Sequence, residues 1–251
     1  MSAATAPAPP RSVRDLRLTR GRAAHSADDV RGSARSWGVD VVTLDLAAAS
    51  VSRPLADDRV LVLLLDPSPE RARSVGRTLV EEERARAARA RPGRGEKFTA
   101  VRGTLRSALG RELGLAPGEV PIVYGEHGKP ALAPTLGSDI RFNVSHTGGL
   151  AAIALARGRE VGVDVELHRP RQRLDLIARA TLTGEEHARF AALPETERLA
   201  AFLDAWSAKE AYSKLLGRGL GLSFGQLELD AVGSRVVRLP VGPRHSGAVA
   251  A

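Results

Sequence analysis

The chain alternates between apolar patterns that are typical of strands and patterns that are typical of helices. Residues 60–65 form an uninterrupted apolar run between two aspartates, which indicates a buried strand. Apolar and polar residues alternate over 140–144, the period-two pattern of a half-buried strand. Two further apolar segments, 150–156 and 161–166, flank the polar stretch Arg-Gly-Arg-Glu, so we expect them to form a hairpin.

Helix start and stop signals predict five helices between and after these strands. A hydroxyl residue before the first turn caps free N–H groups, and glycine or proline ends a helix. The predicted helices are one opened by Ser68-Pro69, one opened by Thr78 and Glu81, one over 97–112 that ends at Gly114, one opened by Thr183 and Glu186 that ends at Pro194, and a long one over 195–216.

The two ends of the chain give weaker signals. Residues 1–57 mix Pro, Ala, Ser and scattered Arg with little periodicity, so we expect a disordered extension with at most a short strand over 41–46. The folded part is expected to begin near residue 58. The last thirty residues are expected to form one or two short strands. Taken together, the pattern predicts an α+β fold.

Composition narrows the chemistry. The 251 residues are 43% hydrophobic and 26% charged, a balance typical of a globular protein. The absence of cysteine excludes disulfides, thiolate nucleophiles and cysteine-ligated metal clusters. The longest apolar run is too short to span a membrane, and the N-terminus lacks the basic and apolar regions of a secretory signal. We therefore expect a soluble, cytoplasmic protein.

The net charge is +8, which favours acidic partners such as nucleic acid, phosphorylated cofactors or acidic proteins. Eight basic residues and one acid lie between Arg84 and Arg106. A nucleic-acid-binding protein is therefore one alternative. Aromatic residues make up only 4% of the chain, so stacking platforms for single strands are scarce. Lysine is rare, and three of its four positions fall in the motifs below: Lys129, Lys209 and Lys214.

The segment Val161-Gly-Val-Asp-Val-Glu166 places two carboxylates on one strand face. Side chains two apart on a strand lie on the same side, roughly 6.6 Å apart, so Asp164 and Glu166 are neighbours while the valines face the core. Neighbouring carboxylates repel unless a cation lies between them, and Mg²⁺ prefers oxygen ligands. The alternative interpretation is the solvated outer face of an edge strand.

The segment Trp206-Ser-Ala-Lys-Glu-Ala-Tyr-Ser-Lys214 places Trp206, Glu210 and Lys214 on one side of a helix. Glu210 then qualifies as a third oxygen ligand and Lys214 as a cation for an anionic substrate or for proton transfer. The alternative interpretation is an ordinary surface ion pair between Glu210 and Lys214, because their order and spacing favour one.

Two shorter motifs suit phosphate binding. In Phe142-Asn-Val-Ser-His-Thr-Gly-Gly149 a strand leads into polar donors and two glycines; a capped turn is the alternative. Ser145 and His146 point to opposite faces of a strand, so a hydrolase is discounted. In Gly125-Glu-His-Gly-Lys-Pro130 a turn presents Lys129, without the spacing of a P-loop.

The order and spacing of these four motifs resemble the 4′-phosphopantetheinyl transferases, specifically the larger single-chain type that activates surfactin synthetase. The resemblance covers about residues 59–225. It implies two similar α+β halves about a pseudo-twofold axis, here residues 58–145 and 146–251, with the site between them and the metal in the second half. It implies transfer of phosphopantetheine from coenzyme A to a serine of an apo acyl or peptidyl carrier protein, with release of 3′,5′-ADP.

The resemblance also implies roles for individual residues. Asp164, Glu166 and Glu210 correspond to ligands of Mg²⁺ (alternatively Mn²⁺), Glu210 also to the base, and Lys214 to a candidate acid for the leaving group. The residues that correspond to coenzyme A contacts are Lys209 at the phosphates, Ser145 and His146 at the 3′-phosphate, Gly128, Lys129 and Pro130 around the adenine, and at least one of Arg84, Arg86 and Arg89 at the 3′-phosphate. The expected protein is a monomer that binds neither nucleic acid nor membrane.

Two departures from the family pattern accompany the resemblance. The extension before Arg59 has no counterpart, and residues 236–251 look short, as if a closing strand pair were missing or abbreviated. The short C-terminus leaves open an inactive relative that binds coenzyme A without transfer.

Overall fold

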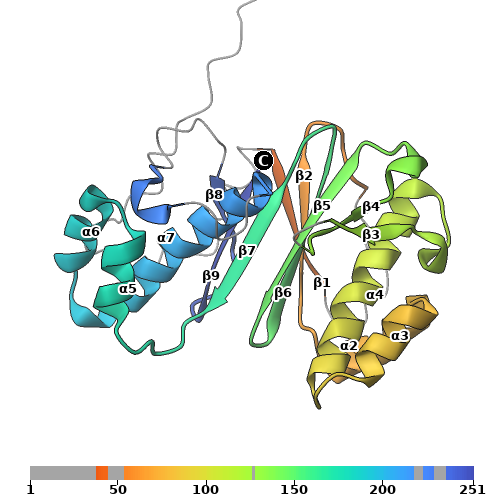
Figure 1. Cartoon of the computed structure of the whole chain (residues 1–251), viewed down its shortest axis with the longest axis horizontal. Helices are drawn as coiled ribbons and strands as arrows, with labels where there is room; N and C mark the ends of the chain where they lie inside the picture. Colours follow the sequence, from red (N-terminus) through yellow and green to blue (C-terminus); the bar gives the residue numbers. More distant parts are fainter. Residues whose placement is uncertain (1–37, 45–53, 126–127, 218–222, 229–235) are drawn as a thin grey trace, which may run out of the picture.

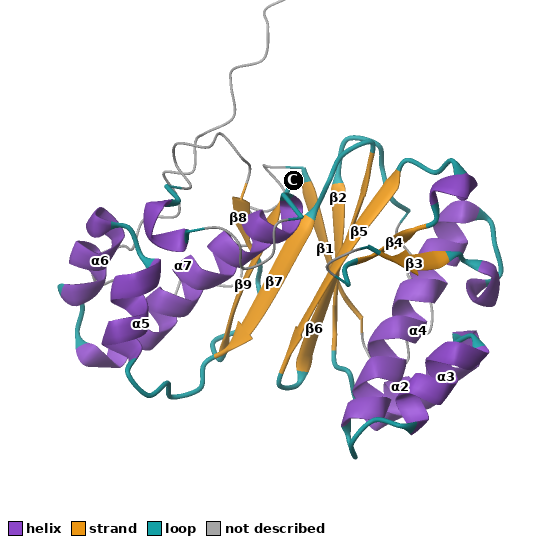
Figure 2. Cartoon of the chain, in the orientation of Figure 1, coloured by secondary structure: helices purple, strands orange, loops and turns teal. Residues whose placement is uncertain are grey.

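The computed structural model describes residues 38–44, 54–125, 128–217, 223–228 and 236–251. These residues form four layers, in which two sheets face each other and helices cover the outer face of each (Figures 1 and 2). Helices and strands are both present throughout, so the predicted α+β class is confirmed.

The first sheet has four strands in the order β1-β2-β6-β5. They are β1 (Val39–Leu44), β2 (Val60–Leu65), β6 (Leu150–Arg157) and β5 (Ile140–Thr147). The first two strands are parallel, and the other neighbours are antiparallel. All six residues of β2 are buried, because side chains of both of its faces enter a core. The apolar run at 60–65 is thus the buried strand that the sequence predicts, and it lies between β1 and β6.

Helices cover the outer face of this sheet. They are α2 (Pro69–Val75), α3 (Glu81–Ala88) and α4 (Arg94–Leu113), followed by a short hairpin of β3 (Ile122–Tyr124) and β4 (Pro130–Leu132). Leu105 and Leu109 of α4 pack with Leu61, Leu63 and Leu65 of β2. The helix ends at Gly114, whose φ of 68° is accessible to glycine without strain.

The second sheet has the order β7-β9-β8. Its strands are β7 (Gly162–Leu167), β9 (His245–Ala250) and β8 (Val236–Arg238), and its helices are α5 (Leu174–Thr181), α6 (Gly184–Ala191) and α7 (Glu195–Leu215). Ala208 and Ala211 of α7 pack against Ala248 and Ala250 of β9. Small side chains on both surfaces let this helix lie close to the sheet.

The inner faces of the two sheets share one core. Val62 and Leu64 of β2 pack with Val163 and Val165 of β7 and with Val249 of β9. Val161, Val163 and Val165 therefore face the core as the sequence predicts, which turns the alternate residues of β7 toward α7. A rotational relation between the two halves stays a prediction.

All five predicted helices are present as α2, α3, α4, α6 and α7. Ser68 caps α2, Thr183 caps α6, and the long C-terminal helix spans 195–215. The helix that Thr78 was expected to open begins instead at Glu81, because the Thr78 hydroxyl donates to the Val75 carbonyl of the preceding turn.

The predicted hairpin of 150–156 with 161–166 is wrong. Those segments are β6 and β7, which lie in different sheets, and the hairpin is formed by β5 and β6 through Gly148-Gly149. Gly148 has a φ of 53°, which explains glycine at this two-residue turn. The predicted boundary at residue 145 would divide this hairpin, so by sheet membership the boundary lies after Arg157.

Both expectations about the chain ends need correction. Val39 to Leu44 form β1, which pairs with β2, so part of the segment 1–57 is a strand of the first sheet rather than a disordered extension. Leu46 and most of the remaining segment lie outside the described residues. The closing strand pair is present as β8 and β9, and β9 occupies the centre of its sheet.

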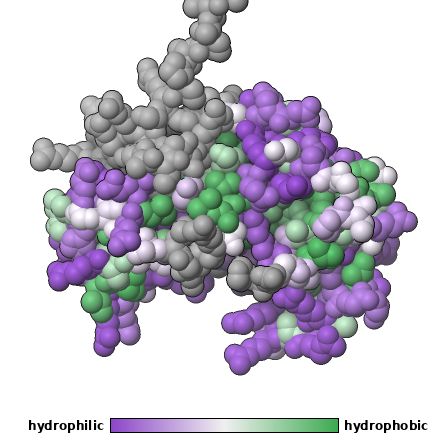
Figure 3. Space-filling view, turned by 45° about the horizontal axis from the view of Figure 1, so that its top comes forward, coloured by the Kyte–Doolittle hydropathy of each residue, from purple (hydrophilic) through white to green (hydrophobic). Residues whose placement is uncertain are grey.

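None of the helices formed by the described residues is long and apolar enough to cross a membrane. In the view of Figure 3, hydrophilic residues cover much of the visible surface, and hydrophobic residues appear as separate patches.

Candidate functional site

Asp164 and Glu166 lie on the face of β7 that α7 covers. Asp164 is buried, with 5% of its surface exposed, and Glu166 is half-buried. The interpretation of this face as the solvated side of an edge strand is therefore wrong. The sheet instead presents two carboxylates to the helix that carries the Trp-Ser-Ala-Lys-Glu motif.

Gly162 lets α7 approach the start of β7 closely. A Cβ atom built on Gly162 would lie 2.0 Å from the Ala211 carbonyl oxygen and 2.4 Å from the Leu215 nitrogen. No side chain fits between these backbones. The close approach brings Lys214 over the strand edge.

The Lys214 ammonium bonds to three groups at the junction of the two halves. Its Nζ lies 2.6 Å from Asp164 Oδ1, 3.1 Å from the Val163 carbonyl oxygen and 3.3 Å from Ser145 Oγ. The surface ion pair between Glu210 and Lys214 that the helix spacing favours is replaced by this tertiary contact with Asp164.

The three carboxylates influence one another. Burial raises the pKa of Glu210 above its ordinary 4.5; Lys214 lowers it, and the charges of Asp164 and Glu166 raise it further. Burial and the charge of Asp164 likewise raise the pKa of Glu166, against the lowering effects of Arg171, Trp206 and Lys214. The charged forms of Glu166 and Glu210 are therefore disfavoured by burial and by the neighbouring carboxylates.

A divalent cation suits this set of donors. Asp164 Oδ2 is buried and has no hydrogen-bond partner, an unsatisfied acceptor in a site with two further carboxylates. Three carboxylates stand against the two cations Lys214 and Arg171, whose Nη2 lies 3.2 Å from Glu166 Oε2. Among the described residues, however, no three acidic or histidine side chains form a preassembled metal site. The donor types fit a hard cation, and side-chain adjustment has to complete its shell.

Ser145 is buried within this cluster, and His146 is exposed on the opposite face of β5. Ser145 Oγ donates to Asp164 Oδ1 at 2.9 Å. The pKa of His146 is lowered by partial desolvation and by the charges of Lys97 and Lys214. The opposite orientations agree with the argument against a serine hydrolase, and they bring only Ser145 to the carboxylates.

The Gly-Lys-Pro turn reaches the end of α7. Lys129 Nζ donates to the Lys214 carbonyl oxygen at 2.9 Å and lies 3.5 Å from Glu160 Oε2. Lysine at a helix C-terminus satisfies a free carbonyl and the helix dipole. Pro130 follows as the first residue of β4, and Gly128 has a φ of 70°.

The expectation that Lys209 faces a phosphate is wrong. Its side chain is completely buried, and Nζ bonds to Glu186 Oε2 at 2.6 Å and to the carbonyl oxygens of Phe224 at 2.7 Å and Thr181 at 3.0 Å. Three partners fill the capacity of an ammonium group. Lys209 joins α5, α6 and the turn at 224–226 to α7.

The arginines of α3 differ in their partners. Arg84 pairs with Glu81 at 2.9 Å and donates to the Leu79 carbonyl, so it stays within its own turn. Arg86 lies over the ring of Phe98 and donates to the hydroxyl of Tyr124 at 3.2 Å. Arg89 is exposed. The hydrogen bonds and ion pairs of Arg84 and Arg86 therefore go to other groups than the three carboxylates, and the 3′-phosphate role of these arginines stays a prediction.

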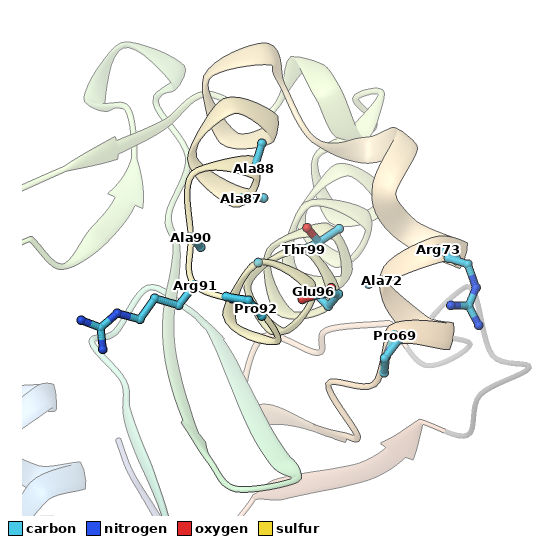
Figure 4. A pocket seen from close by; sticks show the side chains of 11 residues that line it. Pro69, Ala72, Arg73, Ala87, Ala88, Ala90, Arg91, Pro92, Glu96 and Thr99 are labelled. Carbon is cyan, nitrogen blue, oxygen red and sulfur yellow. The ribbon is translucent and has the colours of Figure 1, made fainter.

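A cavity of about 690 Å³ lies elsewhere, between α2, α3 and the start of α4 (Figure 4). Alanine and proline side chains line much of it, with Arg73, Arg91 and Glu96 at its walls. It contains none of the residues of the four motifs.

Known proteins resemble this chain over the region that holds the carboxylates. Residues 160–245, from β7 to the start of β9, match the family described as the 4′-phosphopantetheinyl transferase superfamily. The transferase HetI of Nostoc sp. (strain PCC 7120) is 34% identical over 184 residues, which are 72% of this chain and 77% of HetI.

Two further relatives are also named 4′-phosphopantetheinyl transferases. The transferase AcpT of Salmonella typhimurium is 42% identical over 38% of this chain and 49% of its own length. A Bacillus subtilis 4′-phosphopantetheinyl transferase is 30% identical over 55% of this chain and 60% of its own length. The chain therefore belongs to the 4′-phosphopantetheinyl transferase superfamily, a class of transferases, which confirms the resemblance drawn from its motifs at the level of the superfamily. Membership of the larger single-chain type stays a prediction.

Sequence reasoning missed several groups that complete the site. They include Arg171 beside Glu166, and Asn143 and Thr147, whose side chains bond to β7. The Asn-x-Ser-x-Thr spacing was visible in the sequence. The sequence did not show that these side chains bind β7, because β5 and β7 belong to different sheets.

Proposed function

We propose that this protein transfers 4′-phosphopantetheine from coenzyme A to a serine hydroxyl of an acyl or peptidyl carrier protein, with Mg²⁺, and releases 3′,5′-ADP. The observation that carries the proposal is the cluster of Asp164, Glu166 and Glu210 with Lys214 where α7 meets β7. It combines hard oxygen donors with a cation, which is what cleavage of a diphosphate needs. The activity named for the relatives supports the same reaction.

Asp164, Glu166 and Glu210 would hold the divalent ion, and the unpartnered Asp164 Oδ2 is the first donor available to it. When bound, such an ion neutralises negative charge that develops on phosphoryl oxygens. Lys214 and Arg171 offset two of the three carboxylate charges, which leaves the cluster net negative without metal. The two positive charges of a bound divalent ion would make the cluster net positive. A net positive site suits a diphosphate substrate.

In the proposed step, the carrier serine oxygen forms a bond to the phosphorus that bears pantetheine. The bridging P–O bond breaks, and 3′,5′-ADP leaves with the bonding electron pair. Glu210 accepts the serine proton, directly or through water, and its raised pKa makes it a stronger base than an exposed carboxylate. Lys214 is placed to offset the charge of the leaving phosphate or to protonate it.

Coenzyme A and the carrier are proposed to approach from the basic surfaces around this cluster. His146 and Lys97 are exposed, and the charges of Lys97 and Lys214 both act on His146, so His146 and Lys97 are candidates for the 3′-phosphate and diphosphate. Helix α3, the loop after it and the start of α4 expose Arg86, Arg89, Arg91 and Arg94. An acidic carrier would be attracted to these arginines by charge complementarity.

We propose that one chain is sufficient for activity, as a monomer, because its β7, α7 and β5 supply the whole cluster. The cytoplasmic location expected from the sequence is part of the proposal. The motive for an inactive relative that only binds coenzyme A was a missing strand pair, and that pair is present.

The test is to incubate the protein with Mg²⁺, coenzyme A and several apo carrier proteins, and to weigh each carrier by mass spectrometry. We expect a mass increase of one phosphopantetheine group on at least one carrier, dependent on Mg²⁺ and absent with the Asp164→Ala variant. Unchanged mass for every carrier, from fatty-acid, polyketide and nonribosomal-peptide sources alike, contradicts the proposed function.

A further inference from the structure

One edge of β7 has a side-chain rather than a main-chain partner. On its other edge β7 pairs with β9 from Gly162 to Leu167. In the part of the chain that the structure describes, β5 is an edge strand of the first sheet and β7 is an edge strand of the second. The two strands nevertheless lie side by side, where the sheets meet (Figure 1).

Three polar side chains of β5 bind successive outward N–H groups of β7. Asn143 Oδ1 accepts from Val163 N at 2.9 Å, Ser145 Oγ accepts from Val165 N at 3.3 Å, and Thr147 Oγ1 accepts from Leu167 N at 3.3 Å. Each pair is separated by twenty residues, so the strands run parallel in a fixed register. We call Asn143, Ser145 and Thr147 the side-chain ladder.

The side-chain ladder holds the backbone on both sides of Asp164, a proposed metal ligand. Asn143 binds the N–H of Val163 and Ser145 binds the N–H of Val165, the residues before and after Asp164. Ser145 also donates to Asp164 Oδ1. Asn143 and Ser145 are 5% and 9% exposed, so water does not readily replace them as partners. The register of β7 against β5 therefore determines where this carboxylate lies.

The hydrogen-bonding capacity of Ser145 is already used. A hydroxyl group has one donor and accepts two bonds. Ser145 Oγ donates to Asp164 and accepts from Val165 N and from Lys214 Nζ. No capacity remains for a phosphate oxygen, which is the role that the family resemblance gives to Ser145.

We infer that the side-chain ladder is a positioning device, in which Ser145 fixes Asp164 and Lys214 for the metal and the phosphate instead of binding coenzyme A itself. The inference deepens the proposed function and rests on it for its kinetic consequence. Its structural part concerns only β5, β7 and a divalent ion, so it is testable without a carrier protein.

The existence of the ladder is tested by amide hydrogen exchange with a matched pair of variants. Thr147→Val removes one hydroxyl and keeps the shape, whereas Thr147→Ser keeps the hydroxyl. We expect exchange at Leu167 N–H to quicken at least tenfold in Thr147→Val and to stay near wild type in Thr147→Ser. Equal exchange in the two variants overturns the ladder.

The positioning role is tested with Ser145→Ala, and Ser107→Ala of α4 is the control, because the Ser107 hydroxyl donates to the carbonyl of Gly103 within the same helix. Loss of groups that orient metal ligands typically weakens metal affinity 10- to 100-fold. We expect Ser145→Ala to weaken Mn²⁺ binding, followed by electron paramagnetic resonance, within that range. The control should leave it unchanged.

The kinetic arm separates positioning from coenzyme A binding. For a positioning residue, Ser145→Ala lowers kcat and raises the metal concentration needed for half-maximal rate, while affinity for coenzyme A without metal stays within about twofold. Weaker binding of coenzyme A with unchanged Mn²⁺ affinity and unchanged exchange at Val165 N–H overturns the inference. Wild-type protein that binds Mn²⁺ but transfers nothing would contradict the proposed function and leave the ladder standing.

Discussion

Each half of the molecule contains a buried carboxylate beside a cation, and the two differ in how completely they are paired. In the N-terminal half, Glu83 of α3 receives two bonds from Arg106 at 2.6 and 3.1 Å, and Arg102 lies 3.5 Å away. In the C-terminal half, Asp164 binds Lys214 and Ser145 through one oxygen and leaves the other without a partner.

The difference separates a stabilising pair from a reactive site. Both oxygens of Glu83 have partners, and Arg106 also donates to the carbonyls of Pro117 and Val120, so this pair joins α3 and α4 to the following turn. Asp164 instead has two further carboxylates nearby, Glu166 and Glu210, whose pKa values are raised by burial and by the neighbouring negative charges. A folded chain keeps such an incompletely paired cluster where a ligand completes it.

The largest expected effect comes from removing the incompletely paired carboxylate. Asp164→Ala should lower kcat for phosphopantetheine transfer by about 10³-fold or more, because it removes charge stabilisation where the leaving phosphate develops charge. Glu210→Gln should have a similar effect. Rates from carrier mass spectrometry, with circular dichroism as the folding check, measure this. Near wild-type turnover in Asp164→Ala contradicts the metal assignment.

Removing the fully paired carboxylate should have the opposite profile. Glu83→Ala leaves the buried Arg102 and Arg106 without their anion, which costs about 3–5 kcal/mol in the free energy of unfolding. Urea denaturation measures that change. Activity per folded molecule should remain close to wild type, and a loss of kcat comparable to that of Asp164→Ala would remove the distinction between the two pairs.

A smaller effect is expected where α7 meets β7. Gly162→Ala places a methyl group against the Ala211 carbonyl, so the helix must shift, at a cost of about 1–3 kcal/mol in stability. The shift also moves Lys214 from Asp164, so kcat should fall. Gly118→Ala, where no atom lies within 4 Å of the added carbon, is the control. Equal unfolding midpoints for both variants would show that the contact is not tight.

The smallest effect is a displaced pH dependence. Because burial raises the pKa of Glu210 above 4.5, kcat should begin to fall at a pH above 4.5 as the solution is acidified. The charged forms of Glu166 and Glu210 are disfavoured in the fold. Without metal, the free energy of unfolding should therefore increase as the pH is lowered from their raised pKa values toward 4.5. Higher Mg²⁺ should move the acid limb of kcat to lower pH. A limb centred at 4.5, insensitive to Mg²⁺, argues against a buried base.

The sequence predicted what depends on neighbouring residues. The apolar run of β2, the long α4 and α7, and the shared face of Asp164 and Glu166 follow from periodicity within one element. The helix α5 was missed, because Arg173 at its start provides no side-chain cap.

Features that depend on a distant partner were predicted less well. Lys209 is buried because Glu186 and two carbonyls surround its ammonium, and lysine in a helical motif does not reveal such partners. The change of sheet between β6 and β7 likewise has no local signal, since a polar turn joins hairpins and crossovers alike. The side-chain ladder follows from that change, so it became visible only in the fold.

Asp164, Glu166 and Glu210 are proposed to hold one divalent ion together for a diphosphate. A Mn²⁺ titration followed by electron paramagnetic resonance, with coenzyme A present, tests this for the wild type and for Asp164→Ala. We expect one bound ion per chain in the wild type and none at the same concentrations in the variant. Equal binding by the two proteins, or no binding by the wild type, would contradict it.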